Sequence, residues 1–127
     1  MRSLIICLLS FILITITPTF ADDIDDAKAA YQNFRYDEAL TLFRPMAETG
    51  NARAQLYMGI MYSMGRGVDV DRIEAYIWFN LAASQGVEIA LYYQTNMREG
   101  MSDKNLKEVM DRSLIYYNKF VLPFLDN

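Results

Sequence analysis

Hydrophobic residues recur with helical spacing through most of the chain. In several segments they stand three or four positions apart, as they do along one face of an α-helix. One such stripe consists of Ala39, Leu42, Phe43, Met46 and Ala47. No segment alternates with the period of two that a half-buried strand would show, so we predict an all-α domain without a sheet. The predicted helices cover residues 23–33, 36–49, 51–63, 71–85, 87–99 and 102–119.

The helical pattern repeats along the chain with a constant offset of 36 residues. For example, Glu38 and Ala39 recur as Glu74 and Ala75. A fixed offset across residues of different chemistry indicates structural repeats. We therefore predict three antiparallel helix pairs stacked side by side, about the minimum for a stable stack of this kind. The other matched pairs are Phe43 with Phe79, Ala47 with Ala83, Gly50 with Gly86, Ala54 with Ala90 and Tyr57 with Tyr93.

Residues at the predicted helix ends agree with these boundaries. Gly50 and Gly86 follow helices, where a left-handed residue commonly ends the last turn. Asn51 and Ser102 precede helices and are suitable N-caps. Asp71 and the glutamate three residues later form a capping-box pattern.

Residues 1–21 have the pattern of a secretory signal peptide. Arg2 supplies a positive start, a mostly apolar run extends from Leu4 to Ile16, and Ala21 ends a small-residue cleavage site. The run is shorter than the about 20 residues that a membrane span needs. We therefore expect a cleaved leader and an exported protein, periplasmic or secreted, from a Gram-negative-type envelope. The alternative is an uncleaved leader, which would make the protein a membrane-tethered adaptor.

Composition excludes several classes of chemistry. The 127-residue chain has no histidine, and its single cysteine is Cys7 in the leader. Catalytic triads and histidine-ligated metals are therefore excluded, and the mature chain would have neither thiol nor disulfide. The formal net charge of −4 gives no reason to expect a nucleic-acid partner. We expect no cofactor and no metal.

Three features that suggest ligand chemistry have simpler structural interpretations. The glycines around Arg66 lack the preceding strand of a phosphate loop, so we interpret residues 65–68 as a tight connection between helices. The acidic residues at 22–26 and 69–71 lack the glycine and bidentate glutamate of a calcium loop. Trp78 shares a helical face with other apolar residues, which favours core packing over a ligand platform.

The centre of the chain resembles the Sel1-like repeat (SLR), an α/α-solenoid relative of the tetratricopeptide repeat. The resemblance rests on AQLYMGIMY at 54–62, GRGVDVD at 65–71 and AxxWFxxAAxxG at 75–86. Residues 51–86 form one full unit, whereas 27–50 and 87–120 are divergent terminal units. The resemblance implies a short right-handed α/α solenoid and a role in protein–protein interaction. Some cysteine-rich members are linked to β-lactam binding, but their paired cysteines are absent here.

In tetratricopeptide-like stacks, the first helix of each pair lines an inner groove. The residues of the helix at 51–63 that lie away from the main apolar stripe are Arg53, Leu56, Ile60 and Ser63. The 36-residue offset relates the first three of them to Ile89, Tyr92 and Asn96. Lys28 belongs to the matching position in the first unit, and Gln85 is expected on the outer face. A neighbouring helix or the tail could instead cover these positions. The predicted groove residues are Tyr31, Arg53, Leu56, Ile60, Tyr92 and Asn96.

The expected function is therefore that of an exported, non-enzymatic binding module for a protein or peptide. The domain at 22–120 would supply the groove, and the apolar tail at 121–127 would fold over the last helix pair. The alternatives for the tail are self-association and partner docking. The alternative for the whole protein is a cell-wall-related enzyme or β-lactam-binding protein. Acid–base catalysis would then depend on carboxylates alone.

Overall fold

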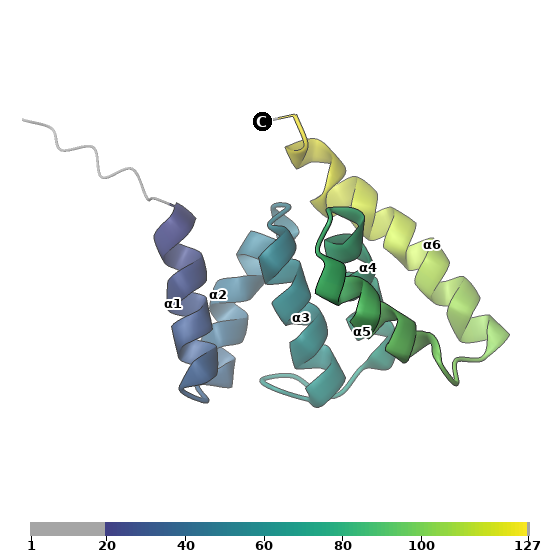
Figure 1. Ribbon diagram of the computed structural model, residues 1–127, viewed down its shortest axis with the longest axis horizontal. Coiled ribbons are helices and arrows are strands. Elements are labelled where there is room, and N and C mark those ends of the chain that lie inside the picture. Colours follow the sequence, from purple (N-terminus) through teal and green to yellow (C-terminus); the bar gives the residue numbers. More distant parts are fainter. Residues whose placement is uncertain (1–19, 127) are drawn as a thin grey trace, which may run out of the picture.

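The computed structural model describes residues 20–126, which form six α-helices and one short 3₁₀ helix, without a strand in this range (Figure 1). The helices are α1 Phe20–Gln32, α2 Tyr36–Glu48, α3 Ala52–Met64, α4 Arg72–Ser84, α5 Glu88–Arg98, α6 Asp103–Phe120 and η1 Leu122–Phe124. Every predicted helix is present, and each end agrees within three residues. Most of the predicted leader, residues 1–19, lies outside the described residues.

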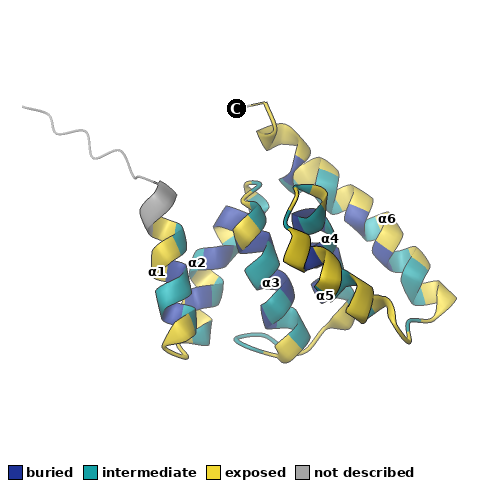
Figure 2. Ribbon diagram, viewed as in Figure 1, coloured by how far each residue is buried: buried dark blue, intermediate teal, exposed yellow. Residues whose placement is uncertain are grey.

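The helices pack in chain order from α1 to α5, which confirms the short α/α solenoid (Figure 1). The last pair departs from the expected arrangement, because α6 packs along α4 and barely touches α5. Val109, Tyr116 and Phe120 on α6 pack with Ile77 and Trp78 on α4. Helix α5 is therefore supported on one side, and most of its residues are exposed (Figure 2). No helix within residues 20–126 has both the length and the hydrophobicity to cross a bilayer.

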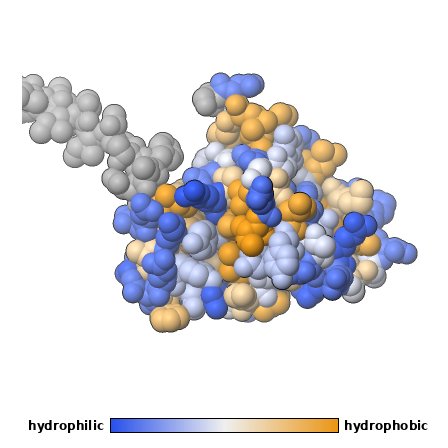
Figure 3. Space-filling model, in the orientation of Figure 1, coloured by the Kyte–Doolittle hydropathy of each residue, from blue (hydrophilic) through white to orange (hydrophobic). Residues whose placement is uncertain are grey.

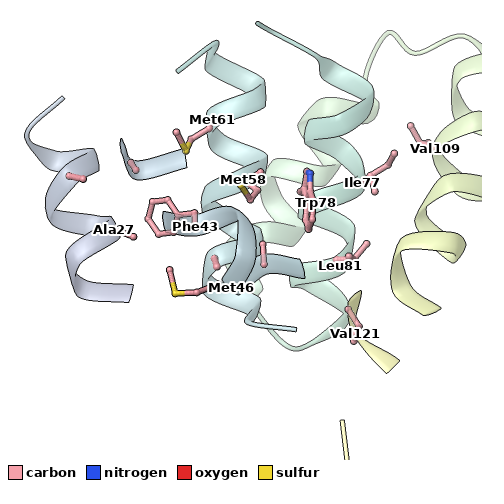
Figure 4. Close-up of a cluster of buried hydrophobic side chains, with 14 residues drawn as sticks. Ala27, Phe43, Met46, Met58, Met61, Ile77, Trp78, Leu81, Val109 and Val121 are labelled. Atoms are coloured by element: carbon pink, nitrogen blue, oxygen red, sulfur yellow. The ribbon is translucent and has the colours of Figure 1, made fainter. Parts of the chain in front are cut away.

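The main core runs through the centre of the solenoid (Figure 4). Trp78 is 2% exposed and stacks on Phe120 with ring centroids 5.7 Å apart, so the prediction that it packs in the core is confirmed. A smaller cluster lies under α5, where Phe79 stacks on Tyr93 at 5.0 Å. The large buried side chains of the main core are Phe43, Met58, Met61, Ile77, Trp78 and Leu81.

The predicted helix caps are largely confirmed. Asn51 accepts a hydrogen bond from the Ala54 amide at 2.9 Å, and Ser102 accepts one from the Asn105 amide at 3.2 Å. Asp71 accepts from two amides of the first turn of α4, both at 3.0 Å. The capping box is only half formed.

Glu74 does not return to the start of α4 as the capping box predicted. Its half-buried carboxylate pairs with Arg112 and accepts a hydrogen bond from the Tyr116 hydroxyl at 3.0 Å. Two donors on α6 therefore compete successfully with the backbone amide for this carboxylate. The pair helps to hold α6 on α4.

The C-terminal tail takes a different position from the predicted one. Val121 is buried in the main core, and the Phe124 side chain lies against Gly50 in the turn between α2 and α3. The tail therefore covers this turn and not the last helix pair. Leu122 and Leu125 remain exposed.

Gly59 lies where α3 and α4 approach most closely. A β-carbon at this position would be 2.5 Å from Cδ1 of Phe79, whose buried ring is held on its other side by Tyr93. Gly59→Ala should therefore lower the free energy of unfolding. The steric conflict costs about 1–3 kcal/mol, whereas alanine gains about 1 kcal/mol over glycine in helix propensity, and we expect the conflict to be the larger effect. Urea denaturation measures this change. The control is Thr95→Ala, an exposed α5 position related to Gly59 by the 36-residue offset. A Gly59→Ala protein more stable than wild type would contradict this packing.

Candidate functional site

A hollow of about 530 Å³ lies between α1, α3 and the turn that connects α4 to α5. We call it the groove. The first helices of successive pairs contribute to it, as expected for the inner side of the stack. Figure 3 shows apolar surface at the middle of this face with hydrophilic side chains beside it. The groove is lined by Lys28, Arg53, Leu56, Tyr57, Gln85, Gly86, Val87 and Ile89.

Two cationic side chains line the groove. Lys28 on α1 makes only a 3.5 Å contact with exposed Asp25. Arg53, in the first turn of α3, is exposed and forms no ion pair among the described residues. A guanidinium without a competing carboxylate can bind a ligand carboxylate through two parallel hydrogen bonds. The groove therefore favours an acidic ligand group.

The rest of the groove is mainly apolar. Leu56 packs against the Phe79 cluster, and Val87 packs there from the start of α5. Ile89 is half exposed and extends the apolar surface. Tyr57 closes the opposite side, where its ring stacks on Phe43 at 4.4 Å. These rigid side chains can bury an aliphatic group of a ligand beside the two cations.

A buried amide connects the groove to the helix turns. Gln55 is 0% exposed, and its Nε2 donates to the Ala47 carbonyl at 3.0 Å. Its Oε1 accepts from Nε2 of Gln85 at 2.8 Å. The expectation that Gln85 lies on the outer face was therefore wrong. Gln85 is the C-cap of α4, where the chain leaves the helix, so the face calculated from the helical period no longer applies.

The predicted groove residues are only partly brought together. Arg53 and Leu56 line the groove, whereas Ile60 lies one turn further along α3 against the Phe79 cluster. Tyr92 and Asn96 are exposed on α5, outside the groove lining. Lys28 and Ile89, which the sequence analysis gave as the matching positions of the other units, also line the groove. Tyr57 and residues 85–87 line it as well and were not among the predicted groove residues.

Tyr31 lies in an aromatic cluster and not in the groove lining. Its ring meets Tyr36 and Tyr57 edge to face, with centroids 5.4 Å and 5.3 Å apart. The Arg66 guanidinium lies over the Tyr31 and Tyr36 rings and donates to the Tyr31 hydroxyl. Residues 65–68 lie between the end of α3 and the start of α4, so their interpretation as a helix connection is confirmed. Tyr31 supports Tyr57, which does line the groove.

Other surfaces offer less for recognition. Smaller hollows of about 300 Å³ and 320 Å³ lie against α4 with α6 and against α2, and neither is lined by a lysine or arginine. On α6, the pKa of exposed Lys107 is raised by a hydrogen bond and by charge attraction from Asp111, away from the groove. The part of the chain that the structure describes has no cluster of three metal-ligating side chains.

Comparison with known proteins matches residues 52–87 to the Sel1 repeat. The exopolysaccharide production negative regulator of Rhizobium meliloti is 37% identical over 60 residues, which are 47% of this chain and 22% of that protein. A protective antigen of uropathogenic Escherichia coli with an SLR fold aligns with a TM-score of 0.73 and 24% identity, over 80% of this chain and 23% of that one. This chain therefore spans less than a quarter of either protein.

Proposed function

We propose that this chain, a Sel1-repeat protein by its match at residues 52–87, binds an acidic, partly aliphatic peptide segment of a partner protein in the groove. Proteins with this repeat are generally interaction modules and typically non-enzymatic. The observation that carries the proposal is the pairing of Arg53, which has no ion-pair partner among the described residues, with apolar Leu56, Val87 and Ile89.

The bound segment would place a carboxylate at Arg53 and Lys28 and an aliphatic side chain between α3 and α5. It could continue along α5, because Tyr92 and Asn96 follow Ile89 at helical spacing and are exposed. An extended peptide or an amphipathic helix meets these requirements. The R. meliloti relative is named a negative regulator of exopolysaccharide production, and a binding role is compatible with that name.

We place this binding outside the cytoplasm, in the periplasm or beyond it. The proposal rests on the leader sequence at residues 1–21, with its positive start, apolar run and cleavage site. N-terminal sequencing of the exported protein tests it. A mature start at Asp22 is the expected result, and an intact Met1 on a membrane-bound protein would favour a tethered adaptor.

A random 12-residue peptide library displayed on phage provides the binding probe. We expect wild-type protein to select peptides that combine Asp or Glu with aliphatic residues. Arg53→Glu should weaken a selected peptide by about tenfold or more, because it places like charges together. Fluorescence polarisation measures the dissociation constant, which should rise with salt.

Lys104→Glu is the matched control, because it reverses an exposed cation on α6 without touching the groove. It should leave peptide affinity within about twofold of wild type, as expected for a distant surface charge. Selection without acidic enrichment, or equal affinity for Arg53→Glu and wild type, would rule out the groove as the binding site. Loss of binding in Leu125→Ser, with Arg53→Glu unaffected, would move the site to the tail.

A further inference from the structure

Gln55 connects two turns that are far apart in sequence. It lies in α3, donates to Ala47 at the end of α2, and accepts from Gln85 at the end of α4. Polar groups are buried in protein cores only when their hydrogen bonds are satisfied. Gln55 makes no other side-chain hydrogen bond among the described residues, so these two bonds account for its burial.

The bonds also fix the direction of both amides. The Ala47 carbonyl can only accept, so Gln55 must turn its Nε2 toward it and its Oε1 toward Gln85. Gln85 must then donate through Nε2. Its own Oε1 makes no hydrogen bond among the described residues and is left as an acceptor at the groove.

The connection ends at the turn that forms one side of the groove. Gln85 directly precedes Gly86, which has φ +93°, and Val87, the N-cap of α5, which makes no side-chain cap bond. Ala90 is the single fully buried residue of α5. The start of the helix is held by the Val87 amide, which donates to the Ala82 carbonyl at 3.2 Å, and by Val87 against the Phe79 cluster, beside the contact between Gln55 and Gln85. Displacement of the turn would move Val87 and Ile89 relative to Arg53.

We propose that Gln55 is a positioning residue for the groove, and that it orients Gln85 as a fixed hydrogen-bond acceptor for a peptide N–H of the bound segment. The second part rests on the proposed function. The first part can be measured without a ligand, because it concerns the stability of the α4–α5 turn.

The test compares Gln55→Met, Gln85→Met and the double variant by residue-resolved amide hydrogen exchange. Folding should survive, because Ala47 also accepts from the Gly50 amide at 3.3 Å and half-buried Gln85 can be hydrated. The Val87 and Ala90 amides, bonded to Ala82 and Val87, should exchange about tenfold faster in either single variant, as expected for local opening. The double variant should exchange no faster than the singles, because both break one connection.

Gln32→Met, at an exposed position of α1, is the control and should leave these amides unchanged. Unchanged exchange at Val87 and Ala90 in both single variants, or additive effects in the double variant, would overturn the positioning role. If Gln55→Met fails to fold, Gln85→Met alone decides, because it removes the same bond from the surface side. In both single variants, a peptide selected on wild type should also bind at least several-fold more weakly.

The outcomes separate the two proposals. Faster exchange with unchanged peptide affinity would refute the binding role of Gln85 while leaving the groove intact. Faster exchange together with unaffected binding by Arg53→Glu would refute the proposed function and limit Gln55 to a structural role.

Discussion

Trp78→Ala should lower the free energy of unfolding by about 3–5 kcal/mol, the usual cost of removing a buried aromatic ring. The ring is 2% exposed, stacks on Phe120 and meets Tyr116 edge to face at 5.5 Å. It therefore supports the α4–α6 contact as well as the central core. Small domains have total stabilities of about 5–15 kcal/mol, so this single change should remove a large share.

Urea denaturation, monitored by far-ultraviolet circular dichroism, measures the loss of stability. Tryptophan fluorescence cannot be used, because Trp78 is the single tryptophan and the substitution removes it. Tyr92→Ala is the control, since this aromatic residue is 61% exposed on α5. It should change stability by less than about 1 kcal/mol. A Trp78→Ala protein that unfolds like wild type but no longer binds peptide would show that the ring serves the ligand and not the core.

The sequence contains enough information to locate the helices and most of their caps. The buried residues of the helices recur at helical spacing, and α4 buries residues of both clusters. The 36-residue offset repeats because each pair must fit its neighbour. Asn51, Asp71 and Ser102 cap where predicted, because an N-cap bond is made within one turn. Such features depend on residues close together in the chain.

Features that depend on contacts between residues far apart in the sequence could not be predicted from the hydrophobic pattern. The periodicity shows which face of α6 is apolar but not whether that face meets α4 or α5. Glu74 has a local partner in sequence, yet it pairs with Arg112, which lies 38 residues away. Phe124 similarly packs against Gly50, because the absence of a side chain at Gly50 leaves room for the Phe124 ring.

In the groove, too, residues placed by helical spacing were predicted, and residues placed by distant contacts were not. Arg53 and Leu56 were predicted because helical spacing separates them from the packed face of α3. Gln85 was misplaced because it follows the last turn of α4, and its position depends on the buried partner Gln55. Gln55 itself stands in the packed stripe of α3, where the 3.6-residue period predicts an apolar side chain. Only the contact between the two amides explains both residues.

Gly67→Val should be almost as damaging as the loss of Trp78. Gly67 has φ +74°, a left-handed conformation that costs an L-residue about 1–2 kcal/mol. A β-carbon there would also be 2.8 Å from the Tyr36 carbonyl oxygen, which is backbone and cannot rotate away. Overpacking of this kind costs about a further 1–3 kcal/mol. We therefore expect a loss of about 2–5 kcal/mol in the free energy of unfolding, measured by urea denaturation.

Two alanine variants separate backbone strain from steric conflict. Gly86 has φ +93°, but a β-carbon at Gly86 would meet nothing within 4 Å, so Gly86→Ala should cost only the strain of about 1–2 kcal/mol. Gly67→Ala carries the same strain and the conflict with Tyr36, and should therefore be the more destabilising of the two. The difference between them measures how tightly the α3–α4 connection presses on the start of α2. Equal losses of stability in the two alanine variants would mean that the Tyr36 carbonyl moves to make room for the β-carbon. A urea midpoint of Gly67→Val equal to that of wild type would mean that the α3–α4 connection does not require glycine at this position.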